Sequence, residues 1–137
     1  MDTKRNVFLW ILYDFANSLV SIVFFLYFAQ WIVIDRGISD LYFNLTFTIS
    51  ALLLLLTVPV TGTLLDKYFR RITGLRYATI LTIIFYGICA LFTIANKEIY
   101  ALVFFTLGLY FYLLSFTFYT SLINDICKPE KRGLISG

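Results

Sequence analysis

Long apolar runs alternate with short polar joints along the whole chain. Four such runs are found, at about residues 7–34, 41–65, 77–95 and 99–123. Each run is long enough for a helix to cross a bilayer, which takes about 20 residues. Only a helix satisfies every backbone amide within one lipid-exposed span, so the pattern predicts four transmembrane helices. The polar joints are residues 35–40, 66–76 and 96–98. We therefore predict a single all-α membrane domain over residues 1–137.

The distribution of Lys and Arg predicts how these helices are oriented. Nine of the 11 basic residues are expected on one side: Lys4, Arg5, Lys67, Arg70, Arg71, Arg76, Lys128, Lys131 and Arg132. Only Arg36 and Lys97 are expected on the other. Because basic residues accumulate in cytoplasmic loops, we predict that both termini and the 66–76 loop are cytoplasmic.

Composition agrees with a chain embedded in the lipid bilayer. Hydrophobic residues make up 61% of the chain and charged residues 14%, whereas soluble domains carry about 25% charged residues. Cys89 and Cys127 are expected at depths too different for a disulfide, and the chain has no histidine. No nucleophile–base pair and no metal-ligand set can be named. We expect no enzyme activity, no cofactor, no metal and no nucleic-acid partner.

The first apolar run contains an ionisable residue, Asp14. It is the only charged residue between Arg5 and Asp35. A carboxylate inside the bilayer costs about 2.5–3.5 kcal/mol on insertion scales, so it needs a partner, a watery cavity or a function. The residues Asn17, Ser18 and Ser21 follow at i+3, i+4 and i+7, which places all four on one helix face.

The fourth run carries a second polar face, formed by Tyr112, Ser115 and Tyr119 at i, i+3 and i+7. Ser115 and Tyr119 are expected at a depth similar to that of Asp14, about 10 Å inside the cytoplasmic end. If the first and fourth helices face each other, either hydroxyl could hydrogen-bond the carboxylate. Three roles remain open for Asp14: a polar contact between helices, part of a solute or proton pathway, or a conformational contact of the N-terminal segment.

The end of the second run carries a recognisable motif. It reads Gly62-Thr-Leu-Leu-Asp66-Lys-Tyr-Phe-Arg70-Arg71, and it resembles the loop motif between the second and third helices of major facilitator superfamily transporters. That motif is Gly-x-Leu-x-Asp-Arg/Lys-x-Gly-Arg-Arg/Lys. Phe69 stands where the motif has glycine, which could alter the turn but leaves the charges in place.

Two further stretches resemble the vacuole-effluxer-like family of that superfamily. The first is Trp10-Ile-Leu-Tyr-Asp14-Phe-Ala-Asn17-Ser18, which is similar to the family's Tyr-Asp-x-Ala-Asn-Ser signature. The second runs from Tyr119 through Asp125, Pro129, Glu130, Arg132 and Gly133 to Ser136-Gly137. Thr120 and Asn124 depart there from the family's Asn and Pro. Together the three matches span the whole chain.

The resemblance implies a twelve-helix transporter that works by alternating access, with the first and fourth helices lining the central cavity. It implies a cytoplasmic charge network that latches one conformation, for which the candidates are Gly62, Asp66, Arg70, Arg71, Asp125, Glu130 and Arg132. Eukaryotic members look like exporters of amino acids from the vacuole, and prokaryotic members look like permeases of the cell membrane. The expected partners are the lipid bilayer, a small solute and a coupling proton.

The chain ends at Gly137, where a family member would begin its fifth helix. Four helices cannot form the six-helix half of such a transporter, so we expect a fragment that lacks its C-terminal helices and does not transport alone. Two other interpretations stay open. The chain could be a complete four-helix protein that transports as an oligomer, or a membrane subunit with a structural role.

Overall fold

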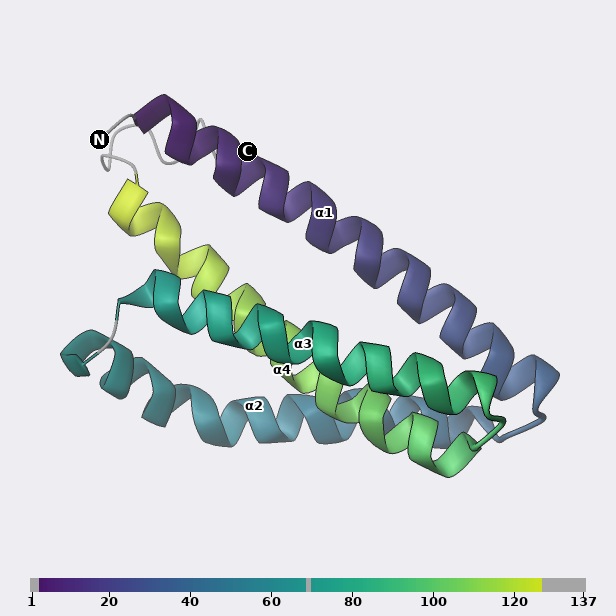
Figure 1. The fold of residues 1–137 in the computed structure, drawn as a ribbon. Helices are drawn as coiled ribbons and strands as arrows, with labels where there is room; N and C mark the ends of the chain where they lie inside the picture. The colour runs from purple at the N-terminus through teal and green to yellow at the C-terminus, as the bar shows by residue number, and fades with distance from the viewer. Residues whose placement is uncertain (1–2, 69, 127–137) are drawn as a thin grey trace.

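The computed structural model describes residues 3–68 and 70–126, and these residues form a bundle of four long helices (Figure 1). The helices are α1 (Thr3–Ala29), α2 (Asp40–Tyr68), α3 (Arg71–Ile94) and α4 (Glu98–Ile126). A short π-helix, η1 (Gln30–Asp35), continues α1. No strand occurs in the part of the chain that the structure describes. Each apolar run of the sequence has become one helix.

All four helices are long and apolar enough to cross a membrane. The qualifying segments are Lys4–Asp35, Asp40–Thr63, Arg71–Ile94 and Glu98–Ile123. Large apolar side chains on the outside of the bundle, such as Leu56 and Ile83, are more than half exposed. An exterior with so many exposed large apolar side chains suits lipid rather than water. The predicted fold class, an all-α integral membrane protein with four transmembrane helices, is confirmed.

Some helix ends lie beyond the apolar runs. The second helix continues to Tyr68 and the third begins at Arg71, so the joint between them is much shorter than the predicted loop 66–76. The fourth helix likewise extends past residue 123, to Ile126. Hydropathy marks the part of a helix that lies in hydrocarbon, whereas backbone hydrogen bonding continues into the polar interface. Arg70, in an extended conformation, is the N-cap of α3.

Helix α4 is the centre of the bundle, because it packs against each of the other three helices. Helices α3 and α4 form a tight antiparallel pair, and α1 and α2 lie on opposite sides of that pair in the view of Figure 1. The turn between α3 and α4 contains Asn96, which has a positive φ of 54°. We call the end of the bundle with this turn the Asn96 end, and the opposite end the Arg71 end.

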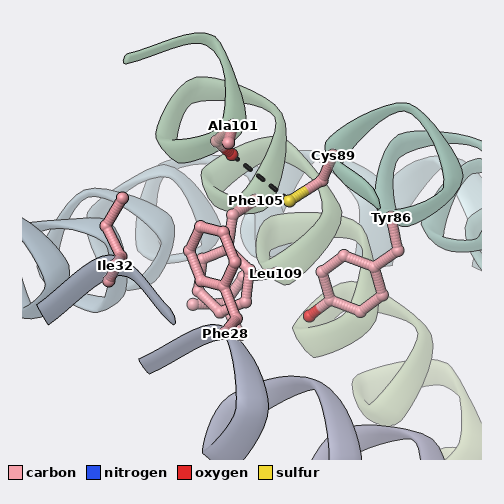
Figure 2. Close-up of a cluster of buried hydrophobic side chains, with 7 residues drawn as sticks. All are labelled: Phe28, Ile32, Tyr86, Cys89, Ala101, Phe105 and Leu109. Atoms are coloured by element: carbon pink, nitrogen blue, oxygen red, sulfur yellow. Dashed lines mark hydrogen bonds between the residues drawn. The ribbon is translucent and has the colours of Figure 1, made fainter. Parts of the chain in front are cut away.

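Two buried clusters fill the bundle, and they differ in which helices take part. The cluster toward the Asn96 end contains Phe28, Ile32, Tyr86, Cys89, Ala101, Phe105 and Leu109 (Figure 2). At its centre Phe105 is fully buried and stacks on Phe28 with ring centroids 4.3 Å apart. The cluster toward the Arg71 end contains Leu75, Ala78, Leu114, Phe118, Tyr119 and Leu122. All of its buried members belong to α3 and α4, so α1 is held more firmly at the Asn96 end.

Candidate transport site

One face of α1 packs against α3 and α4, and aromatic side chains make most of the contacts. Trp10 stacks on Tyr119 of α4 with ring centroids 4.5 Å apart, and Tyr13 stacks on the same ring at 5.3 Å. Further along α1, Phe24 stacks on Tyr86 of α3 at 4.3 Å. The positions 10, 13, 24 and 28 recur at the helical period, so they define the inward face of α1.

The predicted polar face of α1 is divided by this packing. Ser21 is buried and donates a hydrogen bond to the carbonyl oxygen of Ser18 at 2.9 Å, and Asn17 is half-buried. Asp14 and Ser18 are exposed. At about 100° per residue, Asp14 and Ser18 turn away from the line through Tyr13, Asn17 and Phe24. Asp14 therefore lies on the flank of the α1–α4 contact rather than at its centre.

The predicted polar face of α4 meets α1 at the depth of Asp14. Ser115 is buried and donates to the carbonyl oxygen of Tyr112 at 2.7 Å, while Tyr112 itself is half-buried. Tyr119 is buried, and its hydroxyl has no hydrogen-bond partner among the described residues. Trp10 and Tyr13, which lie four residues and one residue before Asp14 on α1, both stack on the Tyr119 ring. The hydrogen bond that the sequence suggested, from Tyr119 or Ser115 to Asp14, is not formed within the described part of the chain.

Three residues at the contacts of α1 with α3 and α4 were not among the site candidates predicted from the sequence. The indole of Trp10 donates to the carbonyl oxygen of Tyr119 at 3.3 Å. The Tyr13 hydroxyl lies 2.8 Å from Oγ1 of Thr79 on α3. The third is Tyr86, whose buried hydroxyl is also without a partner in the described residues. Trp10 and Tyr13 lie four residues before Asp14 and Asn17, so the helical period places them on the same face of α1 and could have predicted their role. Nothing in the sequence distinguishes Tyr86 from the other tyrosines.

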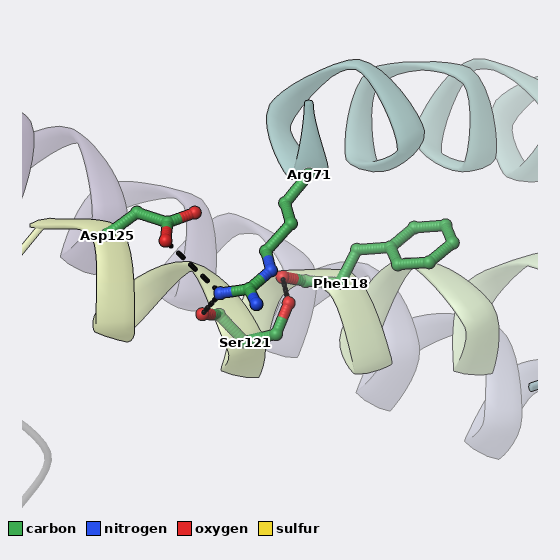
Figure 3. Close-up of polar contacts among 4 residues, drawn as sticks. All are labelled: Arg71, Phe118, Ser121 and Asp125. Atoms are coloured by element: carbon green, nitrogen blue, oxygen red, sulfur yellow. Dashed lines mark hydrogen bonds and ion pairs between the residues drawn. The ribbon is translucent and has the colours of Figure 1, made fainter. Parts of the chain in front are cut away.

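Two of the latch candidates are brought together at the Arg71 end (Figure 3). The Arg71 guanidinium forms an ion pair with Asp125 at 3.1 Å and donates to the carbonyl oxygen of Ser121 at 3.2 Å. Arg71 begins α3 and Asp125 lies in the last turn of α4, so the pair ties the two helices together. Arg70 and Gly62 are exposed nearby along the chain. Glu130, Arg132 and the side chain of Asp66 lie outside the described part of the chain.

The family of the chain is shown by comparison with known protein families. Residues 2–137 match the model of the Major Facilitator Superfamily. The chain belongs to this superfamily. No curated protein and no solved structure was found to match it. The match covers both polar regions described above, the α1–α4 contact and the Arg71–Asp125 pair. The chain is thus a multi-pass integral membrane protein from a superfamily of membrane transporters.

A cleft in this superfamily member opens beside the Arg71–Asp125 pair. Its volume is about 180 Å³, and it lies between α2 and α4. It is lined by Val58, Thr61, Gly62, Arg71, Thr117, Phe118 and Ser121. A side chain added at Gly62 would meet no atom within 4 Å, so the glycine leaves this part of α2 open toward the cleft. The part of α2 around Gly62 is therefore not packed tightly against α4.

The described residues of this superfamily member contain no group of three or more His, Cys, Asp or Glu side chains that could hold a metal ion. Cys89 is buried, and its thiol donates to the carbonyl oxygen of Ala101 at 3.4 Å (Figure 2). Among the described residues, the polar groups near the α1–α4 contact include the Asp14 carboxylate, the Asn17 amide and the hydroxyls of Ser21, Ser115 and Tyr119. Such groups can bind and release a polar solute or a proton.

Proposed function

We propose that this chain takes part in moving a small polar solute across a membrane by alternating access, and that the α1–α4 contact forms part of the solute pathway. The observation that carries the proposal is the buried Tyr119 hydroxyl, which has no hydrogen-bond partner among the described residues and belongs to the ring on which Trp10 and Tyr13, close neighbours of Asp14 on α1, stack. Ionisable groups within transmembrane helices are costly, and they commonly mark solute and proton pathways. The pathway candidates are Asp14, Asn17, Ser18, Ser21, Tyr112, Ser115 and Tyr119.

The difference between the two ends of the bundle supports alternating access. At the Asn96 end, α1 and η1 contribute Phe28 and Ile32 to the buried cluster. At the Arg71 end, α1 contributes only the partly buried Trp10 and Tyr13. Separating α1 from α4 therefore exposes less apolar surface at the Arg71 end, and the free-energy cost of opening is smaller there. Asp14 lies toward this more weakly held end.

The ion pair between Arg71 and Asp125 supports a conformational latch at the same end. Both groups remain partly exposed, with side-chain exposures of 32% and 54%, so the pair is within reach of water and of other charged groups. An exposed pair contributes little to stability and is readily broken and reformed. In our proposal Asp66 and Arg70 join this network, and its formation favours one of two conformations that the solute can bias.

Amino acids are our candidate solutes, and a proton is the candidate coupling ion. The similarity of the stretches at 10–18 and 119–137 to the vacuole-effluxer-like family supports this choice. By the same resemblance, the membrane would be the cell membrane in a prokaryote and the vacuolar membrane in a eukaryote. Asp14 is the group that we assign to the solute or to the proton, because it is the one formal charge deep in α1.

The test is transport by vesicles that contain the full-length protein and show measurable transport before substitution, with Asp14→Asn compared with Asp40→Asn. The second variant removes an exposed carboxylate at the start of α2, outside the α1–α4 contact. We expect Asp14→Asn to lower the uptake or efflux of labelled amino acids at least about tenfold, which corresponds to about 1.4 kcal/mol, and Asp40→Asn to leave it unchanged. Equal rates in the two variants would show that Asp14 has no pathway role.

A further inference from the structure

The Asp14 carboxylate has acceptor oxygens with no donor in the described part of the chain. No hydrogen bond or ion pair within the described residues reaches it, although the side chain lies deep in α1. Arg76 is the basic residue expected closest in depth, because it stands one turn before Thr79, the partner of Tyr13. No ion pair joins Arg76 to Asp14. The negative charge is therefore available to a cation from outside the chain.

The Tyr119 hydroxyl is a second polar group without a partner in the described part of the chain, and its ring stacks on Trp10 and Tyr13, which are close to Asp14 on α1. The side chain is only 3% exposed and the hydroxyl oxygen has no partner among the described residues. A buried hydroxyl without a hydrogen bond costs about 1–3 kcal/mol of folding free energy. A ligand that forms a hydrogen bond with this hydroxyl would remove that cost. A tyrosine hydroxyl can accept one hydrogen bond while it donates another. It can therefore accept a hydrogen bond from an N–H group of a ligand.

Aromatic rings hold this hydroxyl in place. Trp10 and Tyr13 stack on the Tyr119 ring, and the Trp10 indole is hydrogen-bonded to the Tyr119 backbone. Phe116 adds a tilted contact, with ring centroids 5.9 Å apart. Aromatic surfaces attract cations through their quadrupole and repel anions from the ring face. The surroundings of Asp14 and Tyr119 thus match a positively charged group that carries several N–H donors.

We propose that Asp14 and the Tyr119 hydroxyl bind the ammonium group of the transported solute, with Trp10 and Tyr13 as the aromatic wall of the site. This assignment rests on the proposed function and specifies which end of the solute the α1–α4 contact recognises. An ammonium group offers three N–H donors, which match two carboxylate oxygens and one hydroxyl oxygen. The site selects for a primary amine and against a carboxylate or an uncharged end.

The experiment uses Trp10 as its reporter. The chain has two tryptophans, so Trp31→Phe leaves Trp10 as the only one, directly against the Tyr119 ring. The purified full chain in lipid nanodiscs is titrated with butylammonium chloride while tryptophan emission is recorded. Sodium butyrate and butanol are the matched probes of opposite and zero charge. We expect a saturable change in emission with butylammonium alone.

Variants in the same Trp31→Phe background assign the response to the proposed groups. Asp14→Asn should weaken butylammonium binding at least about tenfold and Tyr119→Phe about threefold or more, because the second change removes one hydrogen bond. Asp40→Asn should leave binding unchanged. Circular dichroism melting checks that each variant is folded, and a variant that does not fold is replaced by Asp14→Ser or Tyr119→Leu.

Three results would overturn the ammonium site. These are the absence of a saturable response, an equal response to butanol, and equal affinities in Asp14→Asn and its parent. If transport in vesicles still depends on Asp14 when butylammonium does not bind, only the ammonium assignment fails and the pathway role stands. If butylammonium binds as expected but Asp14→Asn transports normally, the proposed pathway is wrong and the binding site remains.

Discussion

Gly108 lies at a close approach of α4 to the Tyr86 side chain of α3. A Cβ atom added there would lie 2.6 Å from Cε1 and 3.2 Å from Cγ of Tyr86. The Tyr86 ring cannot move aside easily, because Phe24 stacks on one part of it at 4.3 Å and Phe105 lies at 5.8 Å. We expect Gly108→Ala to lower the free energy of unfolding by about 1–3 kcal/mol, the usual cost of overpacking.

The matched control is Gly87→Ala on α3, where an added Cβ meets nothing within 4 Å. This variant should unfold at the parent temperature or slightly above it, because alanine is the better helix former. The measurement is thermal unfolding in detergent micelles, followed by circular dichroism. Equal melting temperatures for the two alanine variants would contradict the close approach at Gly108.

Single residues also show how far the sequence could predict the site. The spacing of Asp14, Asn17, Ser18 and Ser21 predicts one polar arc on α1, and the packing divides that broad arc. Which edge of it faces α4 depends on the bulky neighbours Trp10, Phe24 and Phe28, whose packing is decided by the whole bundle. As a result Ser21 is buried and Asp14 lies on the flank. The helical period alone does not predict which of these residues is buried.

Between helices, small polar residues let α2 lie close to α4. Ser50 is fully buried, and its hydroxyl lies 2.7 Å from the carbonyl oxygen of Thr46 in α2 and 2.9 Å from that of Thr106 in α4. Ser50→Ala removes the link between helices, and such bonds contribute about 0.6 kcal/mol on average within membranes. We expect a small loss of that order in the free energy of unfolding, measured by titration with a denaturing detergent.

A larger side chain at the same position tests the close approach itself. Ser50→Leu should destabilise the bundle more than Ser50→Ala, because the added atoms must separate α2 from α4. Thr48→Ala is the control, since the Thr48 hydroxyl is exposed and bonds only within α2, to Asn44 at 3.3 Å. If Ser50→Leu were as stable as Thr48→Ala, small size at Ser50 would not matter.

At the Asn96 end, an ion pair joins η1 to the start of α4. The guanidinium of Arg36 donates from Nε to Oε1 of Glu98 at 2.6 Å, and it lies 6.0 Å from the centre of the Trp31 ring. The opposite charges of the Arg36 guanidinium and the Glu98 carboxylate attract each other across the joint between η1 and α4. We expect Arg36→Glu to lower the melting temperature and the double variant Arg36→Glu, Glu98→Arg to restore part of it.

The measurement is again circular dichroism melting, now repeated at low and high salt. Because the pair is at the surface, added salt should reduce the difference between the single and double variants. Lys97→Glu is the control, since Lys97 is exposed beside Glu98 but is not part of the ion pair. A double variant that melts no higher than Arg36→Glu would contradict the pairing.

The existence and order of the helices follow from the sequence, while their ends and the π-helix do not. Each apolar run is far longer than needed for a reliable helix, so four helices could be predicted from hydropathy. The widening of the last turns of α1 into η1 has no separate sequence signal, because Gln30–Asp35 is as apolar as the helix before it. Within η1, Ile32 is buried in the cluster around Phe105.

For the molecule as a whole, the two ends of the bundle differ both in charge and in how tightly the helices pack. The Arg71 end carries the basic residues of the α2–α3 joint and the thin α1–α4 contact, whereas the Asn96 end carries the tighter core. A transporter whose two ends differ in cohesion opens first at the weaker one. If the Arg71 end is cytoplasmic, as the excess of basic residues predicts, the conformation that opens most readily faces the cytoplasm.

Orientation can be measured with one cysteine at each end of the bundle. In a Cys127→Ser background, Lys97→Cys places a thiol at the Asn96 end and Arg70→Cys places one at the Arg71 end; both positions are exposed and each change removes one basic residue. Cys89 is buried and should stay unlabelled. We expect a membrane-impermeant maleimide to label Lys97→Cys in intact cells and Arg70→Cys only after the membrane is opened, because the basic excess keeps the Arg71 end inside. The reverse labelling pattern would show that the predicted topology is inverted. The Arg71 end, toward which Asp14 lies, would then face the outside.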